Sequence, residues 1–290
     1  RYQFEEFEKP KTVQFQNMAR VFKPLFKSRD EGWSMMEVDG SQLEFRVAAQ
    51  LGGPDPQAYA DILDPNFDAH CTSASIMNDI PYEEFLEGYR AGDKKFKNMR
   101  TAAKVDTFKP LYGGESGTKK QKRWYKAFKE RYAGIAEQQE AWVEEVLYSK
   151  RLVTPWGMRY YWPRAKRGND GYCNVKSSVY NYPVQALATA EIIPVAVRVL
   201  WSRLRGRDDV RIVNTVHDSA ILEVAPEAVE FVREQSILAF GEDVYKYLDT
   251  VYGMKFEVPL GCGVTVGTHW SEGAEESYNI WPNGKMERVA

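Results

Sequence analysis

The chain has few cysteines, no long apolar run and no excess of positive charge. Its three cysteines, Cys71, Cys173 and Cys262, lie far apart and form no CxxC pair, which argues against a disulfide framework and a zinc site. No apolar run approaches the roughly 18 residues of a membrane helix, and the first residues do not resemble a signal peptide. We therefore expect a globular chain without a membrane segment. It should reside in the cytoplasm or another reducing compartment, and it should not be secreted.

The charge of the chain carries no global signature of nucleic-acid binding. Lys and Arg number 39 against 41 Asp and Glu, which gives a formal charge of -2. Any nucleic-acid contact must therefore come from local patches. The densest basic run lies within residues 119–131 and is followed by an acidic stretch over 137–145. Such a run fits a solvated helix face as well as a track for phosphates.

Hydrophobic periodicity divides the chain into strand-rich ends and a helix-rich middle, which predicts an α+β fold. A short apolar run over 35–39 predicts a strand that ends at Asp39, and a helix follows with Leu43, Val47 and Leu51 on one face. The pattern is helical from about 68 to 150, with interruptions at 113–114 and near Gly134. The Thr-Pro-Trp-Gly turn at 154–157 ends this block.

The second half of the chain predicts further helices and strands around a hairpin. A helix is expected over 176–204, kinked at Pro194, and another over about 226–250. Two β-prone runs within 210–224 predict a hairpin with Asp218 at its tip, and a last strand is expected near 255–260. The final twenty residues carry little signal. Five tryptophans are expected to pack in the core: Trp124, Trp142, Trp156, Trp162 and Trp201.

Two features suggest phosphoryl transfer. Asp39 and Asp218 each follow a predicted strand, and Mg²⁺ is commonly held by one or two carboxylates together with substrate phosphates. Each aspartate alone also fits a turn residue or a helix cap. A spacing of four residues places two cations and two aromatic rings on one face of a helix. The cations suit a triphosphate, and the rings suit stacking on a base. The same spacing also fits an ordinary amphipathic helix. These four residues are Arg100, Lys104, Phe108 and Tyr112.

In combination, these residues resemble the family A DNA polymerases. The segment Asp39-Gly40-Ser41-Gln42-Leu43-Glu44-Phe45-Arg46 is similar to their motif A. The spacing from Arg100 to Tyr112-Gly113 is similar to motif B, and Val216-His217-Asp218 is similar to motif C. The motifs occur in the order of the family. Further similar segments are Gln16-Asn17, Asp68-Ala69-His70 and Asn181-Tyr182-Pro183-Val184-Gln185, so the resemblance extends over about residues 1–270.

The resemblance implies a right-hand polymerase fold and a set of site residues. It implies a palm of antiparallel strands over 1–67 and 154–290 and helical fingers over 68–153. No thumb is expected in this chain, so other segments or chains could supply thumb, exonuclease or processivity functions. The expected partners are a DNA primer–template and deoxynucleoside triphosphates (dNTPs). The implied metal ligands for two Mg²⁺ ions are Asp39, Asp218 and the carbonyl of Gly40.

The remaining implied roles concern the nucleotide and the DNA. Lys104 would also donate a proton to the leaving group, and His70 equally fits an ordinary structural histidine. The residues expected to contact the dNTP are Ser41, Gln42, Glu44, His70, Arg100, Lys104, Phe108 and Tyr112. Those expected to contact DNA are Gly113, Asn181, Gln185 and His217.

Glu44 has two interpretations. In the family that the chain resembles, this glutamate packs against the motif B tyrosine and blocks the space of a ribose 2′-hydroxyl, so ribonucleotides are excluded. The spacing Ser41-x-x-Glu44 also matches a helix capping box. Both could hold at once, and the presence of Tyr112 favours the gate.

The sequence departs from the family pattern at three positions. Ser219 stands where a glutamate usually follows the motif C aspartate, so Asp39 and Asp218 are expected to hold the metals without a third carboxylate. Ser177 stands where an arginine is common, which leaves Lys176 as a potential substitute. Pro110 lies inside motif B, where it should kink or end the helix near Lys109.

Two other functions remain open. Asp-Gly-Ser at motif A and His-Asp-Ser at motif C also resemble the single-subunit phage-type RNA polymerases, which have a small residue in place of Glu44. Glu44 and Phe108 therefore favour DNA synthesis. The second alternative is a catalytically silent module that only binds nucleic acid, but such a site would not be expected to keep both aspartates with Arg100 and Lys104.

Overall fold

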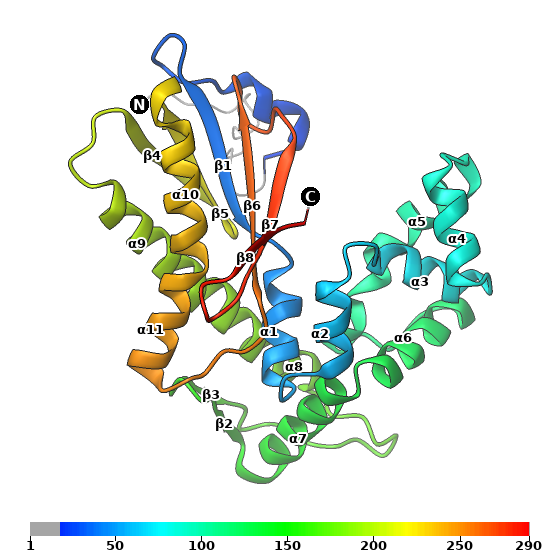
Figure 1. Ribbon diagram of the computed structural model, residues 1–290. Coiled ribbons are helices and arrows are strands. Elements are labelled where there is room, and N and C mark those ends of the chain that lie inside the picture. The colour runs from blue at the N-terminus through cyan, green and yellow to red at the C-terminus, as the bar shows by residue number, and fades with distance from the viewer. Residues whose placement is uncertain (1–17, 290) are drawn as a thin grey trace, which may run out of the picture.

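A computed structural model describes residues 18–289 and builds the molecule around one six-stranded antiparallel sheet (Figure 1). The predicted motif residues Gln16 and Asn17 lie outside the described residues. The strand order is β4-β5-β1-β6-β7-β8. In that order the strands are Val210–Val216, Ser219–Val224, Ser34–Gly40, Leu260–Gly267, Glu275–Ile280 and Met286–Arg288. This combination of helices and an antiparallel sheet confirms the predicted α+β class.

The central strand β1 separates a buried face of the sheet from a polar one. Met36 and Val38 are fully buried, and β1 contacts helix α10 (Val229–Phe240), which packs on α9 (Ile193–Leu204). Because side chains alternate along a strand, Glu37 and Asp39 lie on the other face, where both are only partly buried. Figure 1 shows α9 and α10 on one side of the sheet. The opposite face carries these two polar residues beside a small apolar cluster of Met35, Val216, Ile221 and Trp270.

A long helical segment separates β1 from β4. Helices α3 to α6 form a lobe that projects away from the sheet (Figure 1). The helices are α1 (Leu43–Leu51), α2 (Pro56–Leu63), α3 (Ala69–Asn78), α4 (Tyr82–Arg90), α5 (Lys94–Thr107), η3 (Lys109–Tyr112), α6 (Lys119–Arg131) and α7 (Ala133–Ser149). The helical character of 68–150 and its interruption at 113–114 are confirmed. The domain boundaries at 67 and 153 stay a prediction.

The predicted helix over 176–204 is continuous but changes type along its length. It consists of α8 (Lys176–Gln185), a π-helical stretch (Ala186–Ile192) and α9. Pro194 lies in the first turn of α9, where its missing N–H is best tolerated, and the π stretch precedes it. By length and composition this helical stretch could cross a membrane, a test that core helices of globular proteins also pass. Here it packs against α1, α7, α10 and α11.

The last third of the chain differs from the prediction in three ways. The expected helix over 226–250 is a short turn (Pro226–Ala228) followed by α10 and α11 (Glu242–Tyr252), which are separated at Gly241, where a Cβ would lie 2.4 Å from Ile280 Cγ2. The strand expected near 255–260 was misplaced, because the strand begins at Leu260. The final twenty residues, which carried little signal, form β7 and β8.

Smaller features were also missed or wrong. The turn at 154–157 joins β2 (Arg151–Val153) to β3 (Arg159–Tyr161), a two-stranded sheet that the sequence did not predict, and a short helix η2 (Arg20–Leu25) precedes β1. Trp124, Trp156 and Trp162 are buried as expected. Trp142 is only partly buried. Trp201 is 48% exposed and lies beside two arginine side chains, so its core assignment was wrong.

Candidate active site

Asp39 and Asp218 lie next to each other at the ends of neighbouring strands. Strands β1 and β5 pair in a register that sets Asp39 opposite Ser219, and the N–H of Gly40 donates to the carbonyl oxygen of Asp218 at 3.1 Å. The predicted hairpin is confirmed, with His217 and Asp218 as its two turn residues. His217 has φ 54°, a conformation that is costly for a non-glycine residue. Such strain is concentrated at functional sites, and here it accompanies the turn that presents Asp218.

The carboxylates around Asp39 favour the binding of a cation. Burial, together with the charges of Glu275, Asp218 and Glu37, raises the pKa of Asp39 to about 7. Burial also raises the pKa of Asp218. Carboxylates that crowd each other in a partly buried place are unfavourable unless a cation or a proton compensates them. Oxygen donors of this kind suit Mg²⁺, and the residues present therefore fit such an ion.

Two of these carboxylates were not found from the sequence. Glu37 lies two residues before Asp39 and hence on the same face of β1, a signal that strand periodicity could have given. Ser219 Oγ lies 3.3 Å from Glu37 Oε1. Glu275 comes from the final twenty residues, where no motif pointed to it. Glu37 and Glu275 thus add carboxylates near Asp39, although no trio of His, Cys, Asp or Glu within residues 18–289 forms a ready-made metal cage. That Asp39 and Asp218 hold the metals without a third carboxylate stays a prediction.

A cleft of about 620 Å³ adjoins Asp218 and brings together residues from all three predicted motifs. Asp39 instead borders a second cleft of about 510 Å³, together with Glu37 and Glu275. His217 lines both. The predicted site residues in the first cleft are Gln42, Glu44, Phe108, Tyr112, Gln185, His217 and Asp218. The structure thus collects half of the predicted nucleotide and DNA residues, together with Asp218, in one cleft.

Glu44 and Tyr112 contact each other across this cleft. The hydroxyl of Tyr112 donates a hydrogen bond to Glu44 Oε2, and burial with the nearby charge of Asp218 raises the pKa of Glu44. The capping box was wrong, because the residue before α1 is Gln42, with φ 50°, and no side chain caps that helix end. The carboxylate of Glu44 is therefore engaged with Tyr112 and not with the start of its own helix. The gating role stays a prediction.

The motif B residues do not lie on one continuous helix. Helix α5 ends at Thr107, and Pro110 lies in the short 3-10 helix η3 that carries Tyr112. The predicted end of the helix near Lys109 is confirmed, whereas the continuous stripe from Arg100 to Tyr112 was wrong. Proline cannot donate the hydrogen bond that would continue α5. Tyr112 is thereby turned toward Glu44.

Arg100 lies in the middle of α5 and is held by Asp68, the residue before α3. Its Nε donates to Asp68 Oδ2 at 2.9 Å, its Nη2 lies 2.8 Å from the same oxygen, and its guanidinium lies 4.8 Å from the ring centre of Tyr89. Burial alone would raise the pKa of Asp68, but hydrogen bonds from Arg100 and from the N–H of Cys71 lower it below its ordinary value. Arg100 is therefore a charged and preorganised group.

His70 and Lys104 lie near Arg100. His70 Nδ1 lies 2.9 Å from Thr107 Oγ1, which leaves Nε2 as the ring nitrogen available to a substrate. Burial and the positive charges of Arg100 and Lys104 lower the pKa of His70, which is therefore neutral at pH 7. Lys104 is exposed, and within the described part of the chain it makes no recorded hydrogen bond or ion pair. Arg100 is therefore fixed by an ion pair, whereas Lys104 is exposed to solvent.

The predicted DNA contacts lie around helix α8. Asn181 Nδ2 donates to Gln185 Oε1 at 3.2 Å, while the buried Asn181 Oδ1 has no partner among residues 18–289. Gly113 has φ 77° and packs against Ser177, since a Cβ there would lie 3.2 Å from Ser177 Cα. Ser41 lies beside Gly261, whose carbonyl accepts from the Ser41 N–H at 3.0 Å.

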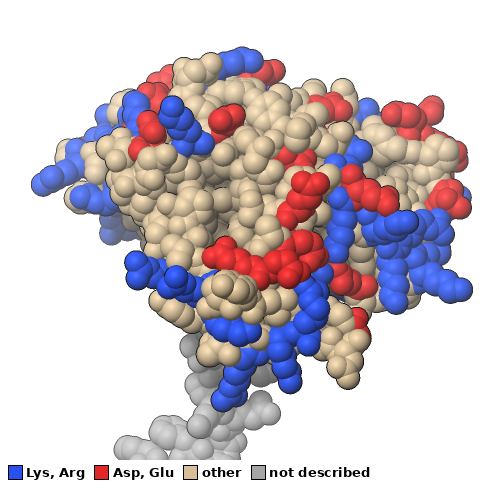
Figure 2. Space-filling model, turned by 90° about the horizontal axis from the view of Figure 1, so that it is seen from below, with Lys and Arg blue, Asp and Glu red and all other residues tan. Residues whose placement is uncertain are grey.

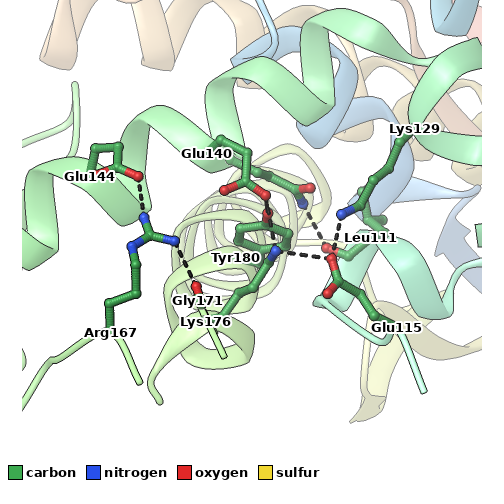
Figure 3. A network of polar contacts seen from close by, with 10 residues as sticks. Leu111, Glu115, Lys129, Glu140, Glu144, Arg167, Gly171, Lys176 and Tyr180 are labelled. Atoms are coloured by element: carbon green, nitrogen blue, oxygen red, sulfur yellow. Dashed lines mark hydrogen bonds and ion pairs between the residues drawn. The ribbon is translucent and has the colours of Figure 1, made fainter. Parts of the chain in front are cut away.

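Lys176 does not have the freedom expected of a substitute for the missing arginine. Its Nζ lies 2.9 Å from both Glu115 Oε1 and Glu140 Oε1, and it is only 9% exposed (Figure 3). Lys129 shares Glu115, and Tyr180 donates to Glu140 at 2.5 Å. Lys176 therefore joins α8 to the helical segment and is not positioned for DNA.

The basic run of α6 is partly neutralised. Several of its cations pair with acidic residues, including Arg123 with Asp79 at 3.1 Å and Arg131 with Asp61 at 2.6 Å. Lys119 and Lys122 are exposed or partly exposed. Seen from below, Lys and Arg gather in separate groups with acidic side chains between them (Figure 2). This arrangement agrees better with a solvated helix face than with one continuous phosphate track.

Comparison with known proteins shows similarity of the chain to one family. The family model described as DNA polymerase family A matches residues 11–272. The thermostable DNA polymerase I of Thermus aquaticus is 29% identical over 259 residues, which cover 85% of this chain and 28% of that protein. That of Thermus thermophilus is 30% identical over 254 residues, with 83% and 27% covered. The chain thus spans less than a third of these relatives. A solved structure, the POL domain of Pol1 from M. smegmatis in complex with DNA primer-template and dNTP, matches with TM-score 0.65 and 21% identity, over 88% of this chain and 44% of that chain.

Proposed function

The chain belongs to DNA polymerase family A, and on that basis we propose that it is the palm-and-fingers part of a template-directed DNA polymerase. It would add deoxynucleoside monophosphates to a primer 3′-hydroxyl and release pyrophosphate, in DNA replication. The palm, over 1–67 and 154–290, would include the six-stranded sheet with α8 to α11, and the fingers, over 68–153, would include α3 to α7. Thumb, exonuclease and processivity functions would come from other segments or chains.

The observation that carries this proposal is the pairing of β1 with β5. It brings Asp39 and Asp218 together from positions far apart in the sequence, beside the cleft that contains Glu44 and Tyr112. A solvated turn or a helix cap would not require two partly buried carboxylates to lie next to each other. A carboxylate pair that holds a divalent ion does require it.

Asp39 and Asp218, with the carbonyl of Gly40, would hold two Mg²⁺ ions. When bound, these ions would supply Lewis-acid chemistry, lowering the pKa of the primer 3′-hydroxyl and stabilising the charge of the leaving pyrophosphate. The protein would fix the positions of these ligands in advance, because strand register and not a flexible loop sets them. Such preorganisation is the main contribution of a protein to phosphoryl transfer.

The helical lobe would bind the nucleotide. Arg100, already charged and oriented by Asp68, would contact the triphosphate, and His70 would face the nucleotide with Nε2. Exposed Lys104 has the reach to follow the phosphates and to donate a proton to the leaving group. Phe108 would pack against the sugar. Glu44, held by Tyr112, would occupy the space of a 2′-hydroxyl and so select deoxyribonucleotides.

Primer extension tests the proposal. The full protein, including any segments outside this chain, should extend a DNA primer on a DNA template with Mg²⁺ and dNTPs, and should use ribonucleotides poorly. Equal use of both sugars would instead favour the RNA polymerase alternative. Binding of primer–template without any incorporation would favour the silent module.

A further inference from the structure

The last two strands lie beyond the residues that the family model matches. The match ends at residue 272, whereas β7 (Glu275–Ile280) and β8 (Met286–Arg288) extend the sheet beside β6. In β7 the register sets Glu275 opposite Thr265 and Ser277 opposite Gly263. The same two residues of β6 pair with Glu37 and Asp39 of β1. Strand β7, the added strand, thus lies two strands away from β1, and its Ser277 is in register with Asp39.

Strand β7 is firmly anchored at its far end. Asn279 is 2% exposed and its Oδ1 accepts from Arg46 Nη2 at 2.8 Å. Arg46 itself also donates from Nε to the carbonyl of Ser41 at 2.9 Å, in the loop that follows Asp39. The carbonyl of Ile280 accepts from Tyr245 at 2.7 Å. These contacts tie the added strand to the segment that carries Asp39.

Gly263 lets the carboxylates of Asp39 and Glu275 approach each other over β6. A Cβ at this position would lie 2.3 Å from Asp39 Oδ1 and 2.8 Å from Glu275 Oε1. The side chain of Glu275 therefore reaches across β6 toward Asp39, over a residue that has no side chain to block it. Both carboxylates border the cleft of about 510 Å³. Such a space, lined by oxygens on both sides, suits a hydrated cation.

Glu37 and Glu275 differ in how many donors already satisfy them. Glu37 Oε2 lies 3.0 Å from Trp270 Nε1 and 3.3 Å from Ser271 Oγ, and its Oε1 lies 3.5 Å from Lys23 Nζ. Within residues 18–289, Glu275 accepts a recorded hydrogen bond only from Ser277 Oγ, at 2.9 Å. A carboxylate has about four acceptor sites. Glu275 therefore retains acceptor sites for a further ligand, whereas most acceptor sites of Glu37 are already engaged.

We propose that Glu275 is a positioning residue of the metal site, a carboxylate supplied by the added strand β7 in place of the one missing at Ser219. It would accept hydrogen bonds from water bound to the ion that Asp39 holds, because Mg²⁺ keeps several waters when few protein ligands are present. This role rests on the proposed polymerase function, since it presupposes a divalent ion at Asp39.

Direct measurement of Mn²⁺ binding tests the role without relying on catalysis. Free Mn²⁺ is followed by electron paramagnetic resonance in titrations of the full protein with a primer–template whose primer lacks the 3′-hydroxyl, plus the matching dNTP. Glu275→Gln should raise the dissociation constant of the weaker Mn²⁺ site roughly tenfold. Ser277→Ala should also raise this dissociation constant, but by a smaller factor.

Glu287→Gln is the matched control. Glu287 lies on the neighbouring strand β8, is exposed and pairs only with Lys285 in the described part of the chain. Its substitution should leave Mn²⁺ binding unchanged. Equal Mn²⁺ affinities of the Glu275→Gln, Glu287→Gln and unsubstituted proteins would overturn the role of Glu275. Absence of primer extension by the unsubstituted protein would instead count against the proposed function, whatever its Mn²⁺ binding.

Discussion

The two sides of the candidate site are held in place by different means. Asp39 and Asp218 lie at strand ends, and the register of β1 and β5 fixes their separation through backbone hydrogen bonds. Arg100 and Tyr112 come from the helical lobe, and side-chain bonds to Asp68 and Glu44 hold them. A backbone register changes only if the sheet opens, whereas single side-chain bonds can break and form again. We therefore expect a rigid metal side and an adjustable nucleotide side.

The largest effect should come from the rigid side. Asp39→Ala or Asp218→Ala should lower single-turnover incorporation by about a thousand-fold or more, because a preorganised electrostatic group is lost. Binding of primer–template, measured by fluorescence anisotropy, should change little. Asp208→Asn, at an exposed aspartate before β4, serves as the control and should be neutral. Near-normal incorporation by either alanine variant would refute the metal assignment.

Sugar selection should show a smaller, selective effect. Glu44→Ala should raise the efficiency of ribonucleotide relative to deoxyribonucleotide incorporation by roughly 10- to 100-fold, as expected for a shape-based discrimination. Tyr112→Phe keeps the ring but removes the donor to Glu44, so its effect should be smaller. The kcat/KM ratio for the two sugars is the measurement, with Glu84→Ala on α4 as the control. If the ratio is unchanged in Glu44→Ala, the gate interpretation fails.

Loss of the fixed cation should weaken nucleotide binding. Arg100→Ala removes a charged donor and should raise the KM for dNTP roughly tenfold, with a lesser effect on kcat. Arg90→Ala removes an exposed arginine that bonds only to Asn66 among the described residues, and it should leave KM unchanged. A purely structural role for Arg100 would instead appear as a lower unfolding temperature with the KM for dNTP unchanged.

The smallest effect should be a pH dependence of stability. The folded-state pKa of Asp39 is raised from 3.8 to about 7, so its contribution is most favourable below about pH 4 and is lost as the pH rises to 7. Without divalent ions, Asp39→Asn should match the unsubstituted protein in urea unfolding at pH 4 and exceed it in stability at pH 7.5. Added Mg²⁺ should reduce this difference by stabilising only the protein that retains Asp39. Equal stabilities at both pH values would contradict the burial and crowding of Asp39.

Much of the fold and of the first cleft could be predicted, because local patterns carried it. The alternating run before Asp39, the hairpin around Asp218 and the helical period after Leu43 each depend on near neighbours in sequence. The end of α5 followed from Pro110, whose effect on a helix is also local. The strand beginning at Leu260 and the helix break at Gly241 were misjudged, because packing against Ile280 and pairing with β1 decide them.

The sequence by itself determined the residue types of the site and their order, since Asp39, Glu44, Arg100, Tyr112 and Asp218 stand in recognisable local motifs. Tertiary structure alone decided which other charges surround them. It brought Glu275 across Gly263 to Asp39, bound Lys176 to Glu115 and Glu140, and kept the carboxylate of Glu44 from capping its own helix. The physical reason is that local propensities follow from near neighbours, whereas strand register and side-chain pairing depend on residues far apart in the chain.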